Sequence, residues 1–384
     1  MRILYVDQTG KLGGGELAIL PWICHAREGA EVALLEDGPF RGLLEQHGIP
    51  VHVFEKNGLN SIRRESGVGA VFRKVPALLD LRHRLAKKAS AFDVVYANSQ
   101  KAFFLSAISR RRHQPLVWHL RDIMSAEHFS PFLRMIAVRF GNWFASVIIA
   151  NSNATADSFV AAGGSRSKVR VVHDGVSAEP FTRVTPEEIS SIRLELGSPN
   201  ALLVGHFGRI SPWKGQHVLL ESIRNLPQFH AVLVGDALFG ETSYADRLRK
   251  LASSAELRGR VHFLGFRRDI PALMMVMDVI AHTSTSPEPF GLVIVEAMLA
   301  GKPIVAAAAG GALEILQDSG QNFGLLTVPG SVRELNRCLV WLVDHPHDVE
   351  QLTHKARQRA EAVFSQKPMF EALTSILRDL ERDE

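Results

Sequence analysis

The stretch from His282 to Gly311, HTSTSPEPFGLVIVEAMLAGKPIVAAAAGG, is the most informative part of the chain. Its first part is rich in Ser and Pro, as loops are, and Gly291 precedes the apolar run LVIVEAMLA. Gly301 ends that run at a position typical of a helix C-terminus. The pattern predicts a loop followed by a helix, with Glu288 in the loop and Glu296 on the helix.

These two carboxylates are spaced to flank a bound anion. At about 1.5 Å per residue, roughly six helical residues separate them by about 9 Å along the axis, which is room for a pyrophosphate. The backbone N–H groups at the helix start, 291–293, would face that anion with a partial positive charge. Glu296 as an ordinary surface residue is the alternative, but its apolar neighbours indicate that it needs a polar partner.

The segment SPEPFGLVIVEAMLAGKPIVA, residues 286–306, resembles the E-x7-E signature of retaining glycosyltransferases of family 4. That family has the GT-B fold, in which two Rossmann-like, doubly wound α/β domains face a cleft. The resemblance implies that Glu288 meets the donor sugar and Glu296 the ribose of the nucleotide. It implies donor contacts also from the residues between them, Phe290, Gly291, Leu292 and Val293.

Length and composition fit a globular protein of two domains. The chain has 384 residues, 46% hydrophobic and 22% charged. Cys24 and Cys338 are its only cysteines, so no disulfide framework is indicated and a reducing cytosol fits. The N-terminal apolar run is too short for a signal peptide, and no run reaches the roughly 18 apolar residues of a membrane span. We therefore expect a soluble, cytoplasmic protein.

Positive charge is concentrated in the first half. Residues 1–180 hold 23 Lys and Arg against 16 Asp and Glu, and the remainder holds 21 against 24. The excess peaks in the stretch 61–90, where apolar residues recur near helical spacing. Such a stretch is typical of a helix on an anionic membrane surface, although a solvated face of a core helix fits equally. We expect no nucleic-acid partner.

The first half alternates short apolar strands with helical stretches, which predicts a parallel, doubly wound sheet. The first strand is followed by QTGKLGGGE, with a helix expected from Glu16. Gly13, Gly14 and Gly15 would let a loop approach a ligand, or form a plain turn. The resemblance favours contact with the donor phosphate or the acceptor. The expected strands are 2–6, 31–35, 51–54, 94–97, 116–120, 147–150 and 169–172.

His119 stands at the carboxyl end of the fifth expected strand, in PLVWHLRD. Doubly wound domains bind ligands at that edge, whereas a lone histidine is otherwise a buried structural residue. The resemblance implies that His119 faces the donor sugar. Further on, His173 and Asp174 replace the proline and asparagine usual in the family, a departure that concerns the hinge and not the chemistry.

The second half repeats the strand and helix alternation, with strands expected near 201–207, 231–234, 261–264, 279–282, 303–307 and 325–328. The first ends in GHFGRISPWKGQ, which places Arg209 and Lys214 beside Gly208. Two cations at a helix start suit a diphosphate leaving group, whose charge grows as the glycosidic bond breaks. A surface turn with two unrelated charges is the alternative.

The resemblance adds two further sites and the domain limits. The loop after the third strand of this half, with Phe266 and Arg267, would hold the nucleobase through backbone groups, and GGALEIL, 310–316, would start a helix beside the sugar. The expected domains are 1–176 for the acceptor and 201–365 for the donor. A linker, 177–200, would join them, and a last helix, 369–384, would cross back onto the first domain.

The predicted function is retaining transfer of a sugar from a nucleotide diphosphate sugar, UDP first and GDP next, to a glycan or lipid-linked acceptor. No cofactor and no metal are expected, since Arg209, Lys214 and the helix start would neutralise the diphosphate. Three alternatives remain: a GT-B sugar-nucleotide epimerase, a non-catalytic subunit that binds sugar nucleotide, and a dinucleotide-dependent oxidoreductase. The last lacks the spaced glycine fingerprint and gives Glu288 and Glu296 no role.

Overall fold

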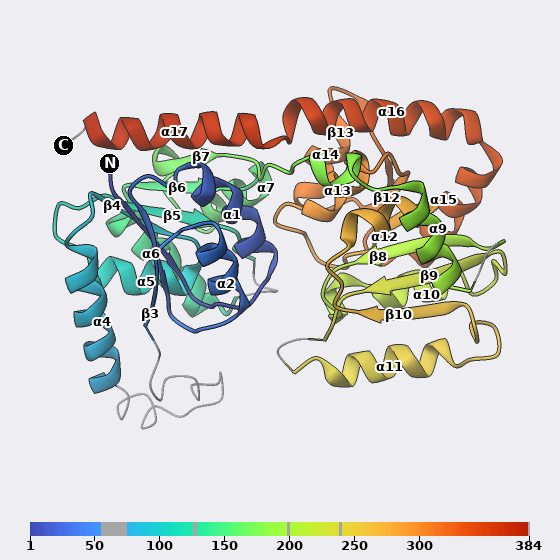
Figure 1. Ribbon diagram of the computed structural model, residues 1–384, viewed down its shortest axis with the longest axis horizontal. Helices are drawn as coiled ribbons and strands as arrows, with labels where there is room; N and C mark the ends of the chain where they lie inside the picture. The colour runs from blue at the N-terminus through green and yellow to red at the C-terminus, as the bar shows by residue number, and fades with distance from the viewer. Residues whose placement is uncertain (55–74, 126–128, 198–199, 238–239, 383–384) are drawn as a thin grey trace. The chain divides into compact units, whose positions relative to one another are not determined.

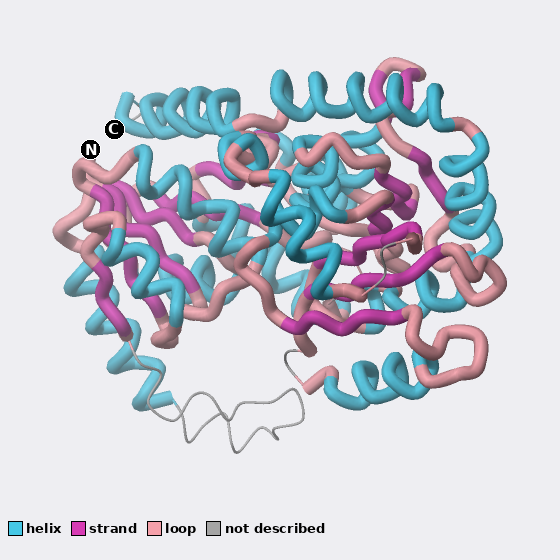
Figure 2. Tube along the Cα trace, turned by 45° about the vertical axis from the view of Figure 1, so that its right-hand side comes forward, coloured by secondary structure: helices cyan, strands magenta, loops and turns pink. Residues whose placement is uncertain are grey.

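The computed structural model describes residues 1–54, 75–125, 129–197, 200–237 and 240–382. The chain divides into two compact units, Met1–Gly175 with Gln366–Glu384, and Val176–Ser365. Within each unit, helices cover both faces of a parallel sheet (Figures 1 and 2). The two doubly wound α/β sheets predicted from the sequence are therefore confirmed.

The first unit is built on a seven-stranded parallel sheet in the order β3-β2-β1-β4-β5-β6-β7. Four strands at the middle of the sheet, β1, β4, β5 and β6, are buried throughout, as expected of parallel strands covered on both faces. The order reverses between β1 and β4, and such a point opens a crevice at the carboxyl ends of the strands. The strands are β1 Ile3–Asp7, β2 Ala30–Leu34, β3 Val51–Val53, β4 Val94–Ala97, β5 Leu116–Leu120, β6 Val147–Ala150 and β7 Val169–Val171.

Two apolar clusters hold helices to this sheet. One cluster packs α1, α2 and α17 on one face, and the other packs α4, α5, α6 and α7 on the opposite face. Side chains alternate between these faces along each strand, so Trp118 and His119 of β5 point to different layers. The helices are α1 Gly14–His25, α2 Pro39–Gln46, α4 Val75–Ala89, α5 Gln100–Ser109, α6 Pro131–Phe144, α7 Asn153–Ala161 and α17 Gln366–Arg382.

The second unit has a six-stranded parallel sheet in the order β10-β9-β8-β11-β12-β15. One apolar cluster binds α10, α11 and α15 to it, and another binds α8, α9, α12, α13, α14 and α16. A short hairpin, β13 Gln317–Asp318 with β14 Gln321–Asn322, was not expected from the sequence. The main strands are β8 Leu202–Phe207, β9 Phe229–Val234, β10 Val261–Gly265, β11 Val279–His282, β12 Ile304–Ala307 and β15 Leu325–Thr327.

Residues 177–200, expected as a linker, contribute to the second unit. They form α8 Glu179–Thr182 and α9 Pro186–Glu195, which both pack on α12. Thr185 and Glu188 form a capping box at the start of α9, and Phe181 and Ile192 are buried in the core. The remaining helices of this unit are α10 Gln216–Ser222, α11 Thr242–Ala252, α12 Ile270–Val276, α13 Leu292–Leu299, α14 Gly311–Leu316, α15 Val332–Asp344 and α16 Pro346–Val363.

Candidate active site

The helix expected within residues 282–311 is α13, and in the described part of the chain no side chain caps its first turn. Gly291 precedes the helix in a left-handed conformation, φ 108°. The backbone N–H groups of Leu292 and Val293 therefore stand at a free helix N-terminus, which favours an anion. Gly301, φ 67°, follows the last turn as predicted.

The loop before α13 lies directly against the turn that starts α14. The Glu288 carbonyl accepts a hydrogen bond from the Gly311 backbone N–H at 2.8 Å. A Cβ atom on Gly310 would lie 2.1 Å from that carbonyl oxygen, so only glycine fits. Phe290, which is predicted to contact the donor, has a side chain that is 2% exposed and packs against Phe364 with ring centroids 5.9 Å apart. Its side chain is part of the core that supports the loop.

Glu288 is the centre of a buried polar cluster. Its Oε2 lies 2.6 Å from Lys214 Nζ, 3.2 Å from His282 Nε2 and 3.2 Å from Ser284 Oγ. Burial alone would raise the pKa of Glu288, but Lys214 and His282 together outweigh it and hold the pKa well below its ordinary value. All these contacts go to Oε2, so Oε1 has no hydrogen-bond partner among the described residues.

Lys214 reaches this cluster from the turn after β8. It ends the 3-10 helix Pro212–Lys214, and Gly215 follows in a left-handed conformation, φ 72°. A Cβ atom on Gly215 would lie 1.9 Å from the Thr283 carbonyl oxygen, so the glycine lets the turn lie against the loop after β11. The Lys214 ammonium also lies 4.3 Å from the centroid of the Trp213 ring. The turn therefore presents a fixed cation.

Arg209 is not in that cluster. Its Nε lies 3.4 Å from Glu241 Oε2, and Ser211 donates a hydrogen bond to the other oxygen of Glu241 at 2.5 Å. Gly208 adopts φ 137° at the end of β8, where the chain turns toward Arg209. Each cation of the predicted clamp is thus already paired with a carboxylate.

Glu296 is the fifth residue of α13 and is half-buried. No hydrogen bond or ion pair to its side chain occurs among the described residues. Burial raises its pKa to about 7. A carboxyl group in this condition suits a ligand hydroxyl as its missing partner, which agrees with the ribose contact that the resemblance implies.

The loop predicted to hold the nucleobase follows β10. The Phe266 backbone N–H donates to Asp236 Oδ2 at 3.1 Å, and the Phe266 side chain is 57% exposed. The Arg267 guanidinium is engaged by Asp269 at 2.6 Å and by Glu195 at 2.9 Å. The Arg267 side chain therefore stabilises the loop, and the predicted base contact is left to backbone groups.

In the first unit, the carboxyl edge of the sheet carries a buried polar network that the sequence analysis largely missed. Arg121 is at its centre: it donates to Asp174 Oδ1 at 2.7 Å and to Asn98 Oδ1 at 2.8 Å. Asn98 in turn donates to Asp7 Oδ2 at 2.6 Å. His119 lies beside this network and is 1% exposed. A usable signal was present, because Asp7, Asn98 and Arg121 each end or directly follow a strand.

The glycine-rich loop is shorter than predicted. α1 begins at Gly14, two residues before the expected start at Glu16, so Gly14 and Gly15 belong to its first turn and Gly13 is the N-cap. Glu16 is buried on this turn, where burial and the nearby Asp7 raise its pKa to about 7. Burial likewise raises the pKa of Asp7 to about 6. Two carboxyl groups with raised pKa values, those of Asp7 and Glu16, therefore lie at the edge of the sheet where the glycine-rich loop was expected.

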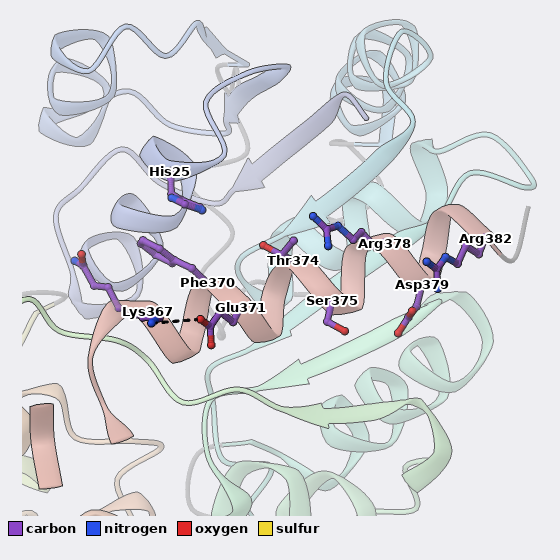
Figure 3. Close-up of a pocket in the computed structure, with 10 residues that line it drawn as sticks. His25, Lys367, Phe370, Glu371, Thr374, Ser375, Arg378, Asp379 and Arg382 are labelled. Atoms are coloured by element: carbon purple, nitrogen blue, oxygen red, sulfur yellow. Dashed lines mark ion pairs between the residues drawn. The ribbon is translucent and has the colours of Figure 1, made fainter. Parts of the chain in front are cut away.

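Three further observations concern other kinds of site. A surface groove of about 820 Å³ runs along α17, lined by its polar side chains and by His25, which stacks on Phe370 (Figure 3). It contains none of the predicted site residues. Among the described residues, no group of three or more His, Cys, Asp or Glu side chains is placed to hold a metal ion. No described helix is long and apolar enough to cross a membrane.

Comparison with known proteins shows the family of the chain. The model for glycosyl transferases group 1 matches residues 190–359, and the model for the glycosyl transferase 4-like domain matches residues 23–175. The crystal structure of Anabaena Alr3699/HepE with UDP and glucose is 41% identical, with a TM-score of 0.88 over 98% of this chain and 99% of that one. The chain belongs to glycosyltransferase family 4. The predicted GT-B fold is likewise confirmed.

More distant relatives of this glycosyltransferase act on different substrates. Sulfoquinovosyl transferase SQD2 of Arabidopsis thaliana is 28% identical over 322 residues, 80% of this chain and 60% of that protein. D-inositol 3-phosphate glycosyltransferase of Mycobacterium sp. (strain KMS) is 34% identical over 168 residues, 43% of this chain and 37% of that protein. The chain thus spans less than two thirds of the length of either enzyme.

Proposed function

We propose that this glycosyltransferase moves a hexose from a UDP-sugar to a hydroxyl group of a glycan or lipid-linked acceptor, with retention at the anomeric carbon. The observation that carries the proposal is the pairing of Lys214 with Glu288 beside the open N-terminus of α13. The UDP and glucose bound by Alr3699/HepE support the choice of donor.

In the proposed reaction, the diphosphate of the donor lies at the start of α13 and draws Lys214 away from Glu288. Glu288 then holds a sugar hydroxyl, beginning with its free Oε1, and Glu296 accepts hydrogen bonds from the ribose. As the bond between the anomeric carbon and the phosphate oxygen breaks, the electron pair stays on UDP, where Lys214 and the helix start stabilise it. The acceptor oxygen attacks from the same face, and its proton passes to the departing phosphate oxygen.

A panel of nucleoside diphosphates tests the donor, because a ligand that binds only the folded protein raises its melting temperature. UDP should raise it most, and transfer should continue in EDTA. The anomeric configuration of the product, read by NMR, tests retention. An inverted product would refute the mechanism. Conversion of a UDP-sugar into its epimer without acceptor would favour the epimerase, and a melting shift with NAD but not with UDP would favour the oxidoreductase.

We also propose that the acceptor is reached at the inner face of a membrane, through the first unit. Residues 61–74 of the basic stretch lie outside the described residues, but its remainder forms α4, where Leu79 is 53% exposed. On α6, Phe132 and Trp143 are 65% and 70% exposed, and the sequence 129–146 contains Arg134 and Arg139 but no acidic residue. Exposed aromatic and basic side chains together suit an anionic lipid surface.

Co-sedimentation with vesicles checks this location. Binding to vesicles containing phosphatidylserine should exceed binding to neutral vesicles and should fall as salt rises. The double variant Phe132→Ser and Trp143→Ser should lose most of that binding, while Leu194→Ser, an equally exposed apolar residue on α9 of the second unit, serves as the control. Equal binding to neutral and anionic vesicles at low salt would refute the proposal.

A further inference from the structure

One ring nitrogen of His119, Nδ1, lies within hydrogen-bond distance of two other side chains, those of Tyr96 and Arg121. The imidazole lies on β5 next to Tyr96 of β4, with the rings nearly perpendicular at 73° and their centroids 5.8 Å apart. The Tyr96 hydroxyl is 2.7 Å from His119 Nδ1, and the Arg121 guanidinium is 3.2 Å from the same atom. The tyrosine alone leaves the direction of its hydrogen bond open, because a hydroxyl group both donates and accepts.

Arg121 removes that ambiguity. A guanidinium carries only donors and keeps its charge in proteins, so the atom it faces must accept. Nδ1 therefore bears no proton, and the Tyr96 hydroxyl donates to it as well. A ring rotated by half a turn would present carbon to both donors and leave them unpaired. Arg121 is itself fixed by Asn98 and Asp174, and the Tyr96 ring by Tyr5, with centroids 5.1 Å apart.

The other ring nitrogen, Nε2, is buried and has no hydrogen-bond partner in the described part of the chain. An unpaired buried N–H is costly, so its persistence at a ligand-binding edge points to a ligand that accepts from it. Burial, reinforced by the Arg121 charge, also lowers the pKa of His119 well below its ordinary value. The ring therefore stays neutral at physiological pH.

We propose that Tyr96 and Arg121 are positioning residues that hold His119 with its proton on Nε2, so that it meets the ligand as a hydrogen-bond donor and not as a base. The tautomer follows from the geometry of the first unit alone. The identity of the accepting atom, a hydroxyl oxygen of a sugar substrate bound at this edge of the first unit, rests on the proposed function. The step is a hydrogen bond only, and no proton leaves the ring.

Histidine-selective ¹⁵N labelling of the full chain tests the tautomer without any ligand. The His119 signals are those missing from the spectrum of His119→Gln. In a long-range ¹H–¹⁵N correlation at neutral pH, Nδ1 should resonate as an unprotonated ring nitrogen and Nε2 as a protonated one. A proton on Nδ1, or on both nitrogens, would overturn the proposal.

Kinetics with UDP-glucose test the action of Tyr96 through His119. Tyr96→Phe should lower kcat/KM by about three- to tenfold, the effect of one hydrogen bond. Glutamine can place an amide N–H near the position of Nε2 without needing a tautomer, so Tyr96→Phe should have no further effect in the His119→Gln background. Equal losses in both backgrounds would make Tyr96 merely structural and overturn its assigned role. If the wild type does not turn over UDP-glucose, the proposed donor fails, and the NMR result alone judges the tautomer.

Discussion

Replacing Glu288 by alanine should destabilise the second unit. Glu288 and Lys214 lie 2.6 Å apart, and their side chains are only 12% and 16% exposed. Removing one partner of such a pair leaves the other charge uncompensated, at a cost of about 3 kcal/mol. In a unit of this size each kcal/mol lowers the melting temperature by about 2–4 °C, so we expect a fall of roughly 6–12 °C.

The effect should depend on pH in a definite direction. The folded-state pKa of Glu288 is depressed below its ordinary value of 4.5, although burial by itself would raise it, because Lys214 and His282 favour the carboxylate. The stabilisation is therefore fully present above pH 4.5 and is lost as pH falls through the depressed folded-state pKa. The difference between wild type and Glu288→Ala should be complete at pH 7 and shrink in acid.

The same substitution should leave UDP binding intact or tighten it, because Lys214 is released for the diphosphate. Transfer should nevertheless collapse, since the sugar loses its carboxylate. Glu296→Ala is the matched control: it should weaken UDP and the intact donor by similar factors, each lost charge-assisted hydrogen bond being worth about 1.5–3 kcal/mol.

Calorimetric titration of both variants with UDP and with donor measures all four affinities, and urea denaturation measures stability. Adding Lys214→Met to Glu288→Ala should restore part of the lost stability, because it removes the stranded charge. If Glu288→Ala weakens UDP as much as Glu296→Ala does, the two carboxylates are not divided between sugar and ribose, and the donor does not lie along α13 as reasoned.

Three further predictions follow from the charges of the site. Lys214→Ala and Arg209→Ala should each lower kcat far more than they weaken the binding of uridine monophosphate, because the charge that Lys214 and Arg209 stabilise grows in the transition state. A near-wild-type kcat in steady-state kinetics would exclude the clamp. Glu296→Gln should be more stable than wild type at pH 8 by about 1–3 kcal/mol, because burial disfavours the ionised Glu296 carboxylate and so raises its folded-state pKa to about 7. In thermal melts at a series of pH values, this gain should vanish below pH 4.5, where the carboxyl group is protonated in both the folded and the unfolded chain. Asp174→Ala should cost about 3–5 kcal/mol in urea denaturation, because it leaves Arg121 unpaired in the network, and a smaller loss would mean that water compensates Arg121.

Much of the fold could be predicted because parallel strands that are buried on both faces can be recognised in a sequence as short apolar runs. The expected strand 116–120 matches β5, and 279–282 matches β11. The hairpin of β13 and β14 was not predicted because a strand of two residues is too short to show a periodic pattern. The start of α1 was misjudged because glycine is a poor helix former, and here tertiary packing overrides that propensity. Residues 177–200 appear polar because only a few side chains, such as Phe181 and Ile192, reach the core.

The sequence could suggest residues for the candidate site but not the contacts between them. A motif indicates that Glu288 and Lys214 matter, but nothing in it says that two side chains 74 positions apart share a hydrogen bond. The burial of the Phe290 side chain in the core was not predicted either, because the position of a residue between two site carboxylates does not show which way its side chain points. Which ring nitrogen of His119 carries the proton depends on Tyr96 and Arg121, and only the folded sheet brings these side chains together.

The return of α17 to the first unit has a consequence for synthesis on the ribosome. Met369, Leu373 and Leu377 complete the apolar cluster that buries Ile19 and Trp22 of α1. These last residues emerge only after all of Val176–Ser365, and at about 5–20 residues per second that interval lasts roughly 10–40 s. For that time the nascent first unit exposes an uncovered apolar face. A chaperone that binds apolar segments should therefore crosslink to α1 in stalled chains that end at residue 365. The same crosslink should be lost in chains that include α17.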